Sequence, residues 1–232
     1  MMSYIEKNLT QVREKIRISA ESCQRSNEDV TLIAVTKTYG VELINEAIGL
    51  GVTDIGENRV QEIMEKYSQV LPVRWHLIGH LQKNKVKYII DKVELIHSVD
   101  SFELAREIDK HAKKIGKTQR ILLEVNVSGE ESKFGICPEN CAEICKAVSG
   151  LENVKIEGLM TVAPFVDDEE ILSEVFEGLK KLALEMEALG ISNVSMKELS
   201  MGMTNDFPLA ITKGATMVRV GTGIFGKRNY TK

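Results

Sequence analysis

One lysine, Lys37, comes just after the apolar run LIAV at positions 32 to 35. Hydrocarbon around the stem of such a lysine disfavours its charge and so favours the neutral amine, which can attack a carbonyl carbon. The position therefore suits formation of a Schiff base. Taken alone, Lys37 reads more simply as a solvated loop residue, because most lysines lie in water. The rest of the chain has to decide between the two readings.

Two segments near the carboxyl terminus each run from an expected strand through a turn of small residues into an expected helix. They are LSMGMTNDF (199–207) and VRVGTGIFG (218–226). Backbone N–H groups at such turns, close to helix N-termini, bind phosphate well. The groups expected to point at a dianion are the N–H groups near Gly202, Gly221 and Gly223 and the hydroxyls of Ser200 and Thr222.

Arg219 precedes the second of these turns by two residues. A guanidinium is permanently charged and needs a partner at such a place. Two readings stay open: a structural pair with a carboxylate, or donation to a ring nitrogen or phosphate of a bound molecule.

Short runs with strand character alternate with longer segments of helical spacing along the whole chain, which is typical of a parallel sheet built from βα units. The eight expected strands are 31–36, 53–56, 74–79, 94–99, 121–127, 155–160, 197–201 and 216–221. The clearest expected helices are 41–51, 101–116 and 169–190, each of which ends on glycine. Residues 3–25 predict an additional helix before the first strand.

This alternation predicts the α/β class and a (β/α)8 TIM barrel, with residues 1–232 as a single domain. The active face of such a barrel lies at the carboxyl ends of its strands. The polar residues expected there are Lys37, Glu57, Asn58, Arg59, His80, Asp100, Asn126, Thr161, Ser200, Arg219, Gly221 and Thr222.

Composition excludes several classes of partner. The 30 basic and 34 acidic residues are scattered along the chain, so we expect no nucleic-acid partner. No run approaches the roughly 20 apolar residues that span a bilayer, and the amino terminus has no secretory pattern. We therefore expect a cytoplasmic protein with no membrane contact.

The four cysteines are Cys23, Cys137, Cys141 and Cys145. Three of them are spaced by four residues, which would stack them on one helix face. Zinc sites usually combine ligand pairs from turns with further Cys or His, and the sequence offers neither here. We expect buried or half-exposed free thiols and no metal site.

Eight segments, in order, resemble a known family. They are AVTKT around Lys37, GENRVQE (56–62), WHLIGHLQKNK (75–85), ELIHSVDS (94–101), VNVSGEESKFG (126–135), GLMT (158–161), ELSMGMTNDF (198–207) and VRVGTGIFG (218–226). In these segments the chain resembles the pyridoxal phosphate homeostasis proteins, also called the proline synthase co-transcribed family. The resemblance covers about residue 30 to residue 226.

The resemblance implies a barrel of the alanine racemase N-terminal-domain type with pyridoxal 5'-phosphate in Schiff-base linkage to Lys37. It also implies a phosphate site, an arginine that faces the pyridine nitrogen and an asparagine near the ring. The matching residues are Ser200, Met201, Gly202, Gly221 and Thr222 for the phosphate, Arg219 for the nitrogen and Asn58 for the ring. Thr204 stands where the family usually has serine, and either hydroxyl can cap the following helix.

The implied function is storage, buffering or delivery of pyridoxal phosphate, with cofactor-dependent apo-enzymes as recipients, rather than enzymatic turnover. A guanidinium beside the pyridine nitrogen disfavours protonation of the ring and makes it a poorer electron sink, although alanine racemase works with a similar arginine. The second, β-rich domain of those racemases is not expected, because the chain ends at Lys232. A barrel without open sheet edges leads us to expect a monomer.

Two other functions remain open from the residues. One is a pyridoxal-phosphate-dependent racemase or lyase of low activity on a small amino acid, and the other is a lysine aldolase that acts on a phosphosugar. Tyr39, two residues after Lys37, could supply an acid or base but is more simply structural. His80 follows Gly79 at the expected barrel mouth and could approach the cofactor, whereas we expect structural or solvent roles for the other three histidines.

Overall fold

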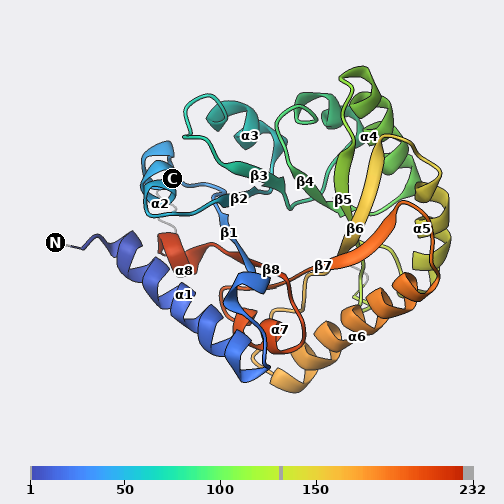
Figure 1. The fold of residues 1–232 in the computed structure, drawn as a ribbon. Helices are drawn as coiled ribbons and strands as arrows, with labels where there is room; N and C mark the ends of the chain where they lie inside the picture. The colour runs from blue at the N-terminus through green and yellow to red at the C-terminus, as the bar shows by residue number, and fades with distance from the viewer. Residues whose placement is uncertain (1, 131–132, 227–232) are drawn as a thin grey trace.

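Eight parallel strands close into a barrel in chain order, each paired with its sequence neighbours and β8 with β1. The computed structural model describes residues 2–130 and 133–226 (Figure 1). The strands are β1 (Thr31–Val35), β2 (Asp54–Glu57), β3 (Arg74–Leu77), β4 (Leu95–Val99), β5 (Gln119–Glu124), β6 (Val154–Met160), β7 (Val194–Met203) and β8 (Met217–Val220). The predicted barrel and all eight predicted strands are confirmed, including the least distinct of them, β2.

Helices follow the strands around the outside of the barrel. They are α2 (Val41–Gly49), α3 (Val60–Lys66), the 3-10 helix η2 (Lys83–Tyr88), α4 (Phe102–Lys114), η3 (Pro138–Asn140), α5 (Cys141–Ser149), α6 (Glu169–Ala188), α7 (Phe207–Thr212) and α8 (Thr222–Phe225). Before β1 lie α1 (Tyr4–Ser22) and the short η1 (Asn27–Asp29). The expected extra helix at the amino terminus is thus confirmed.

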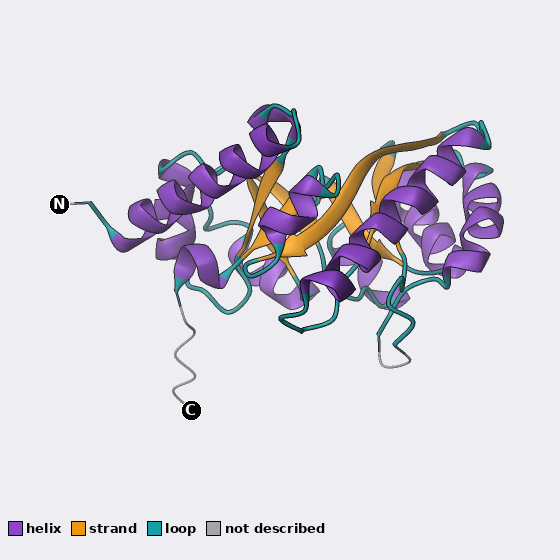
Figure 2. Cartoon of the chain, turned by 90° about the horizontal axis from the view of Figure 1, so that it is seen from below, coloured by secondary structure: helices purple, strands orange, loops and turns teal. Residues whose placement is uncertain are grey.

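Helix α1 covers the flank of the barrel next to α7 and α8 (Figures 1 and 2). It begins at the cap residue Ser3, whose Oγ accepts a hydrogen bond from the N–H of Glu6. Its buried residues Ile5, Leu9 and Val12 recur at three and four. This spacing places them on one face, which packs against the barrel's own helices.

The apolar core has two parts, because strand side chains alternate between the inside and the outside of the barrel. The larger part fills the space between the strands and the helices. The smaller is formed by strand residues that face the barrel interior: Ile33, Leu95, Leu122, Met160 and Met217. The interior is therefore only partly apolar.

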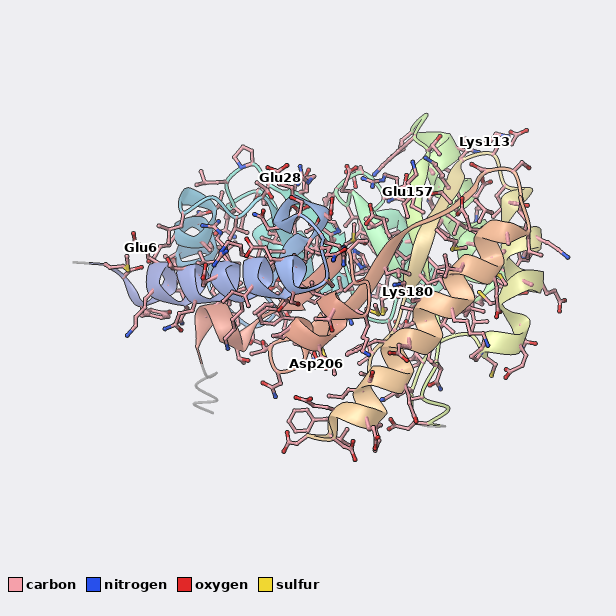
Figure 3. All side chains as sticks on the ribbon, turned by 60° about the horizontal axis from the view of Figure 1, so that its bottom comes forward. Glu6, Glu28, Lys113, Glu157, Lys180 and Asp206 are labelled. Atoms are coloured by element: carbon pink, nitrogen blue, oxygen red, sulfur yellow. The ribbon has the colours of Figure 1, made fainter. Side chains whose placement is uncertain are left out.

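Charged side chains are distributed over the molecule, as the labelled acidic and basic residues of Figure 3 illustrate. Among the helices that the structure describes, none is both long and apolar enough to cross a membrane. Over the same residues, no cluster of three or more His, Cys, Asp or Glu side chains is arranged to hold a metal ion.

All four cysteines are free thiols, as expected. Cys141 and Cys145 are buried on α5, and Cys23 is half-buried. The expectation was wrong for Cys137, which is exposed just before η3 and α5 begin.

Candidate functional site

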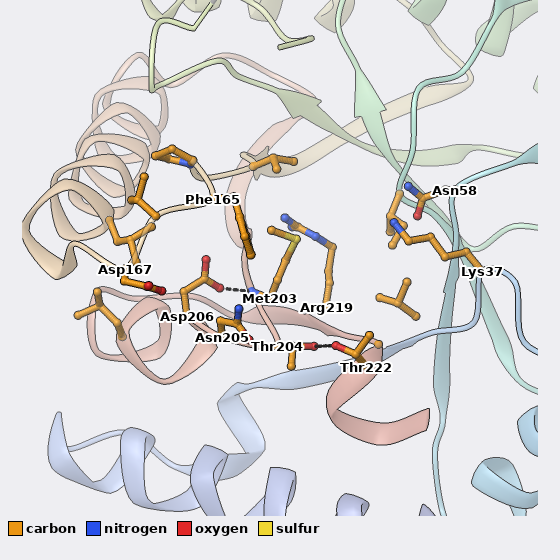
Figure 4. Close-up of a pocket in the computed structure, with 18 of the residues that line it drawn as sticks. Lys37, Asn58, Phe165, Asp167, Met203, Thr204, Asn205, Asp206, Arg219 and Thr222 are labelled. Atoms are coloured by element: carbon orange, nitrogen blue, oxygen red, sulfur yellow. Dashed lines mark hydrogen bonds between the residues drawn. The ribbon is translucent and has the colours of Figure 1, made fainter. Parts of the chain in front are cut away.

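A cavity of about 620 Å³ lies at the carboxyl ends of the strands. Five of the eight predicted site residues line it: Lys37, Asn58, Arg219, Gly221 and Thr222. The other three, Ser200, Met201 and Gly202, are not among its lining residues, whereas the residues that follow them in the chain, 203–206, are. Figure 4 shows Lys37 and Asn58 on one flank of the cavity and Arg219 across from them.

Asn58 brings a buried acceptor to the cavity. It comes from the turn after β2, and its Oδ1 is buried without a hydrogen-bond partner among the described residues. Gly79 permits this packing, since a Cβ at Gly79 would lie 2.5 Å from the carbonyl oxygen of Asn58. A buried acceptor without a partner is costly, so Asn58 favours a ligand that donates a hydrogen bond.

A buried lysine of α3, Lys66, holds the segment that carries Lys37. Lys66 Nζ donates to the carbonyl of Thr36 at 2.9 Å and to Glu57 Oε1 and Glu62 Oε2 at 2.7 Å each. Glu62 Oε2 also accepts from the N–H of Thr38 at 2.7 Å. The backbone on both sides of Lys37 is therefore fixed by one ionic cluster.

The burial of Glu57 raises the pKa of its carboxyl, and the nearby Lys66 ammonium opposes that shift. Thr36 Oγ1 donates to the same oxygen, Oε1, at 2.7 Å. Sequence reasoning found Glu57 at a strand end but missed Lys66, which looks like an ordinary lysine near the end of an amphipathic helix.

The two small-residue turns meet at a pair of threonines. Thr222 Oγ1 lies 3.3 Å from Thr204 Oγ1, which also accepts from the N–H of Gly223 at 3.4 Å (Figure 4). The idea that Thr204 caps the helix after its own turn was wrong, because α7 begins after Asp206 and the Thr204 hydroxyl bonds to the start of α8 instead. The contact joins the turns after β7 and β8 into one surface.

Gly202 is required by the close approach of β7 to α7. Its φ is +89°, and a Cβ there would lie 2.6 Å from Cβ of Ala210 and 2.9 Å from Cα of Phe207. Only glycine adopts this conformation without cost. Its role in the structure is thus to turn the chain tightly toward Met203 and Thr204.

Arg219 is buried, and its guanidinium is held by neutral acceptors. NH1 donates to Ser200 Oγ at 2.6 Å and NH2 donates to the carbonyl of Thr161 at 2.8 Å. Burial lowers the pKa of Arg219 to about 10, against the opposing effect of Glu124 and Asp206. No carboxylate among the described residues forms an ion pair with Arg219, so the carboxylate-pair reading is not what the structure shows.

Ser200 lies inside the barrel rather than on the cavity. Its Oγ accepts from Arg219 and lies 2.9 Å from His97 Nδ1. The hydroxyl therefore does not point at the turn, in contrast to the expectation that it would face a dianion. The alternation of strand residues explains the difference, because the side chain of Ser200 is directed into the barrel interior.

Two carboxyl groups near Arg219 have raised pKa values. Burial, together with the charge of Asp100, raises the pKa of Glu124 to about 7, and Glu124 Oε2 has no hydrogen-bond partner among the described residues. Burial also raises the pKa of Asp206, whose Oδ1 accepts from the N–H of Met203. Of the two, Asp206 lines the cavity.

Tyr39 takes a structural role, and His80 lies outside the cavity. Tyr39 is buried against Phe225, and its hydroxyl donates to the carbonyl of Gly226 at 2.8 Å, which confirms the structural reading. His80 stacks on Phe134 and lies 3.5 Å from Asp100. It is not among the residues that line the cavity.

Sequence reasoning missed the loop after β6 as part of the site. Phe165 lines the cavity (Figure 4). Its side chain is 92% exposed. An aromatic residue beside Pro164 after a strand was the available signal. In the family-like segment 126–135, residues 131–132 lie outside the described residues.

Comparison with known proteins identifies the family. The family model of the alanine racemase N-terminal domain matches residues 8–229. The pyridoxal phosphate homeostasis protein of Aquifex aeolicus (strain VF5) is 44% identical over 224 residues, which cover 96% of this chain and 97% of that protein. This chain belongs to the pyridoxal phosphate homeostasis protein family.

Two solved structures are similar to this chain in both sequence and fold. A protein of unknown role from Bifidobacterium adolescentis matches with a TM-score of 0.91 and 38% identity, over 96% of this chain and 94% of that one. PipY of Synechococcus elongatus PCC7942, solved with PLP bound, matches with a TM-score of 0.80 and 34% identity, over 91% of this chain and 99% of that one.

An alanine racemase from Clostridium difficile 630 shares the fold. It matches with a TM-score of 0.77 and 18% identity, over 98% of this chain and 57% of that one. The predicted barrel type is thereby confirmed.

Proposed function

We propose that this protein binds pyridoxal 5'-phosphate in the cavity at the barrel mouth and stores, buffers or delivers it, rather than turning over a substrate. The observation that carries the proposal is the meeting of Lys37, Asn58 and Arg219 around one cavity with the two small-residue turns. The PLP-bound structure of the relative PipY supports the choice of cofactor.

The residues present fit this group. Lys37 supplies an amine for its aldehyde, and Arg219 supplies a buried cation for its ring nitrogen. Asn58 supplies a buried acceptor whose Oδ1 has no hydrogen-bond partner among the described residues. The turns that meet at Thr204 and Thr222 supply hydroxyl and backbone N–H groups for its phosphate. A cavity of about 620 Å³ lies within the usual range for small-ligand sites.

The proposed attachment is a Schiff base on Lys37. The amine nitrogen forms a double bond to the aldehyde carbon, and the carbonyl oxygen leaves as water together with the two amine protons. Hydrolysis reverses the step without any oxidant or reductant, so the bond can both hold the cofactor and release it.

Buffering or delivery, rather than catalysis, is supported by the names of the relatives and by the residues around Lys37. The curated relatives at 34 to 44% identity are named homeostasis proteins. Tyr39 is the nearest candidate for a second acid or base, but its hydroxyl is bonded to the Gly226 carbonyl. When bound, pyridoxal phosphate supplies an electron sink, and the cation of Arg219 beside the ring nitrogen would weaken that property.

The covalent part of the proposal is tested by absorbance. We expect visible absorbance of the loaded protein to survive dialysis and to be absent from Lys37→Ala. Lys181→Ala is the matched control, because Lys181 is 80% exposed on α6 and its loss should leave the spectrum unchanged. An unchanged spectrum in Lys37→Ala would remove Lys37 as the anchor.

Delivery is tested by adding a cofactor-free acceptor enzyme to the loaded protein. We expect the acceptor enzyme to gain activity while the visible absorbance of the loaded protein falls. We also propose that the protein acts as a monomer, because a closed barrel offers no free sheet edge to a second copy.

A racemase or lyase of low activity is the second candidate, and one observation favours it. Asp206 lines the cavity and has a raised pKa, which is a common property of acid and base groups. Exchange of the α-proton of small amino acids in deuterated water tests this candidate. No exchange above that of free pyridoxal phosphate would exclude it.

A further inference from the structure

Five side chains from five strands form a continuous hydrogen-bonded chain through the barrel interior. Asp54 Oδ1 lies 2.9 Å from His76 Nε2, and His76 Nδ1 lies 2.9 Å from His97 Nε2. His97 Nδ1 lies 2.9 Å from Ser200 Oγ, which accepts from Arg219 NH1 at 2.6 Å. The chain runs from the amino-terminal end of β2 to the residue of β8 that lines the cavity.

The hydrogen-bonded chain ends, away from the cavity, at the fixed negative charge of Asp54. The carboxylate of Asp54 accepts from Arg74 Nε at 2.7 Å and from Arg74 NH2 at 2.6 Å. It also accepts from Thr53 Oγ1 at 2.7 Å. Together with the hydrogen bond from His76, these bonds hold the pKa of Asp54 well below its ordinary value despite its burial, so Asp54 is an acceptor only.

When His76 carries a single proton, the charge of Asp54 determines the direction of every other bond. His76 must donate from Nε2 to the carboxylate, and in a neutral ring its Nδ1 is then an acceptor. His97 accordingly donates from Nε2 to His76. Its burial lowers the pKa of His97 well below the ordinary value, so this ring is neutral and its Nδ1 is also an acceptor.

Ser200 is oriented by the same sequence of bonds. Its hydroxyl proton goes to His97 Nδ1, which leaves lone pairs of Oγ for Arg219. The opposite order would require either a proton on Asp54, which Arg74 disfavours, or protons on both ring nitrogens of His76. With His76 protonated on Nε2 alone, all donors point away from the cavity, from Arg219 toward Asp54.

We propose that His97 and His76 are positioning residues for Arg219: they orient the Ser200 hydroxyl as an acceptor and so fix the guanidinium against the cavity. This inference rests on the proposed cofactor site, where Arg219 faces the bound ring. Because the acceptors at Arg219 are neutral, its charge is not cancelled at the cavity.

A purely structural role would ask only that each buried ring nitrogen have some partner. The chain is more specific, because it uses both nitrogens of both rings and permits one pair of neutral tautomers. It also ends on the one arginine that lines the cavity in the described part of the protein.

The first test observes the tautomers in the protein itself, without cofactor or substitution. Nitrogen-15 NMR correlations of histidine side chains at neutral pH should show both rings neutral and protonated on Nε2, for His76 and for His97. A proton on Nδ1 of His97, or a cationic ring at either position, would overturn the proposed direction.

The second test measures cofactor affinity. His97→Leu removes the acceptor of the Ser200 hydroxyl, whose proton can then turn toward Arg219 and weaken the charge-assisted bond between them. Binding of pyridoxal phosphate should weaken about tenfold. His97→Asn keeps an oxygen near the position of Nδ1 and should recover part of the affinity. Leu122→Ala is the control, since it alters the packing of the barrel interior but removes no member of the hydrogen-bonded chain.

The outcomes separate this inference from the proposed function. If His97→Leu binds as tightly as the native protein, or Leu122→Ala is weakened as much, His97 is not a positioning residue. If the native protein binds no pyridoxal phosphate at all, the proposed function fails, while the NMR result still decides the direction of the chain.

Discussion

Lys37 and Arg219 both present basic side chains to the cavity, and neighbouring residues hold both segments in place. Arg219 is fixed through its own guanidinium, by Ser200 and the Thr161 carbonyl. The backbone beside Lys37 is fixed at Thr36 and Thr38 by the cluster of Lys66 and Glu62.

At the scale of single residues, the raised pKa of Glu124 predicts that the stability of the fold depends on pH. Its pKa is raised from the ordinary 4.5 to about 7 in the folded protein, so the folded state keeps a proton that the unfolded state loses. The stabilising contribution is fully present below pH 4.5 and is lost as pH rises through about 7. This shift corresponds to about 3 kcal/mol.

Urea unfolding of Glu124→Gln and native protein at pH 4 and pH 8 measures this contribution. Because the amide cannot ionise, the variant should gain stability relative to the native protein at the higher pH. An equal difference between the two proteins at both pH values would contradict the raised pKa.

The candidate residues Lys37, Asn58 and Arg219 could be predicted from the sequence because each lies at or just after the end of an expected strand, in a segment that resembles the family. The direction of the Ser200 side chain could not be predicted. It depends on which way β7 faces and on His97, which is 103 residues away in the chain.

At the scale of elements, α3 supports the loop of Lys37 through Lys66. Lys66→Met should destabilise the protein by about 3 to 5 kcal/mol, because it leaves the buried carboxylate of Glu57 without its cation. It should also weaken cofactor binding, since the Thr36 carbonyl loses its donor.

Urea unfolding and a cofactor titration of the same variant measure both effects. The control is Lys110→Met on α4, where the ion pair with Glu107 is exposed and contributes little. Equal unfolding free energies of the two variants would show that the cluster around Lys66 does not stabilise the fold.

The turn between β7 and α7 gives a second prediction at this scale. Gly202→Ala should lower the unfolding free energy by more than the roughly 1 to 3 kcal/mol of an unfavourable backbone conformation, because its Cβ would also overlap Ala210 and Phe207. Gly190→Ala separates the two causes, since Gly190 has a φ of +59° and no atom within 4 Å of the added carbon.

Denaturant unfolding of both variants compares the costs. A loss in Gly202→Ala no larger than in Gly190→Ala would mean that the turn can move away from α7.

Element boundaries were predicted less well than element types. The fifth strand was expected at 121–127 but β5 is Gln119–Glu124, and β7 is Val194–Met203 rather than 197–201. Irregular register between β6 and β7 and between β7 and β8 explains why period-two patterning failed there.

At the scale of the whole molecule, the regular alternation of strands and helices was enough to predict the closed barrel, since right-handed parallel connections leave few other arrangements. The polar interior was not predicted. His76 and His97 each sit in an otherwise apolar strand pattern, and only the closed barrel brings them to Asp54 and Ser200.

The proposed storage and delivery of pyridoxal phosphate depend on a reversible bond between Lys37 and the cofactor. Borohydride reduction of the loaded protein, followed by peptide mass spectrometry, tests this claim directly. We predict one pyridoxyl group, on the peptide that contains Lys37, and none after Lys37→Ala. A pyridoxyl group on another lysine, a sugar adduct on Lys37, or no adduct on the loaded protein would contradict it.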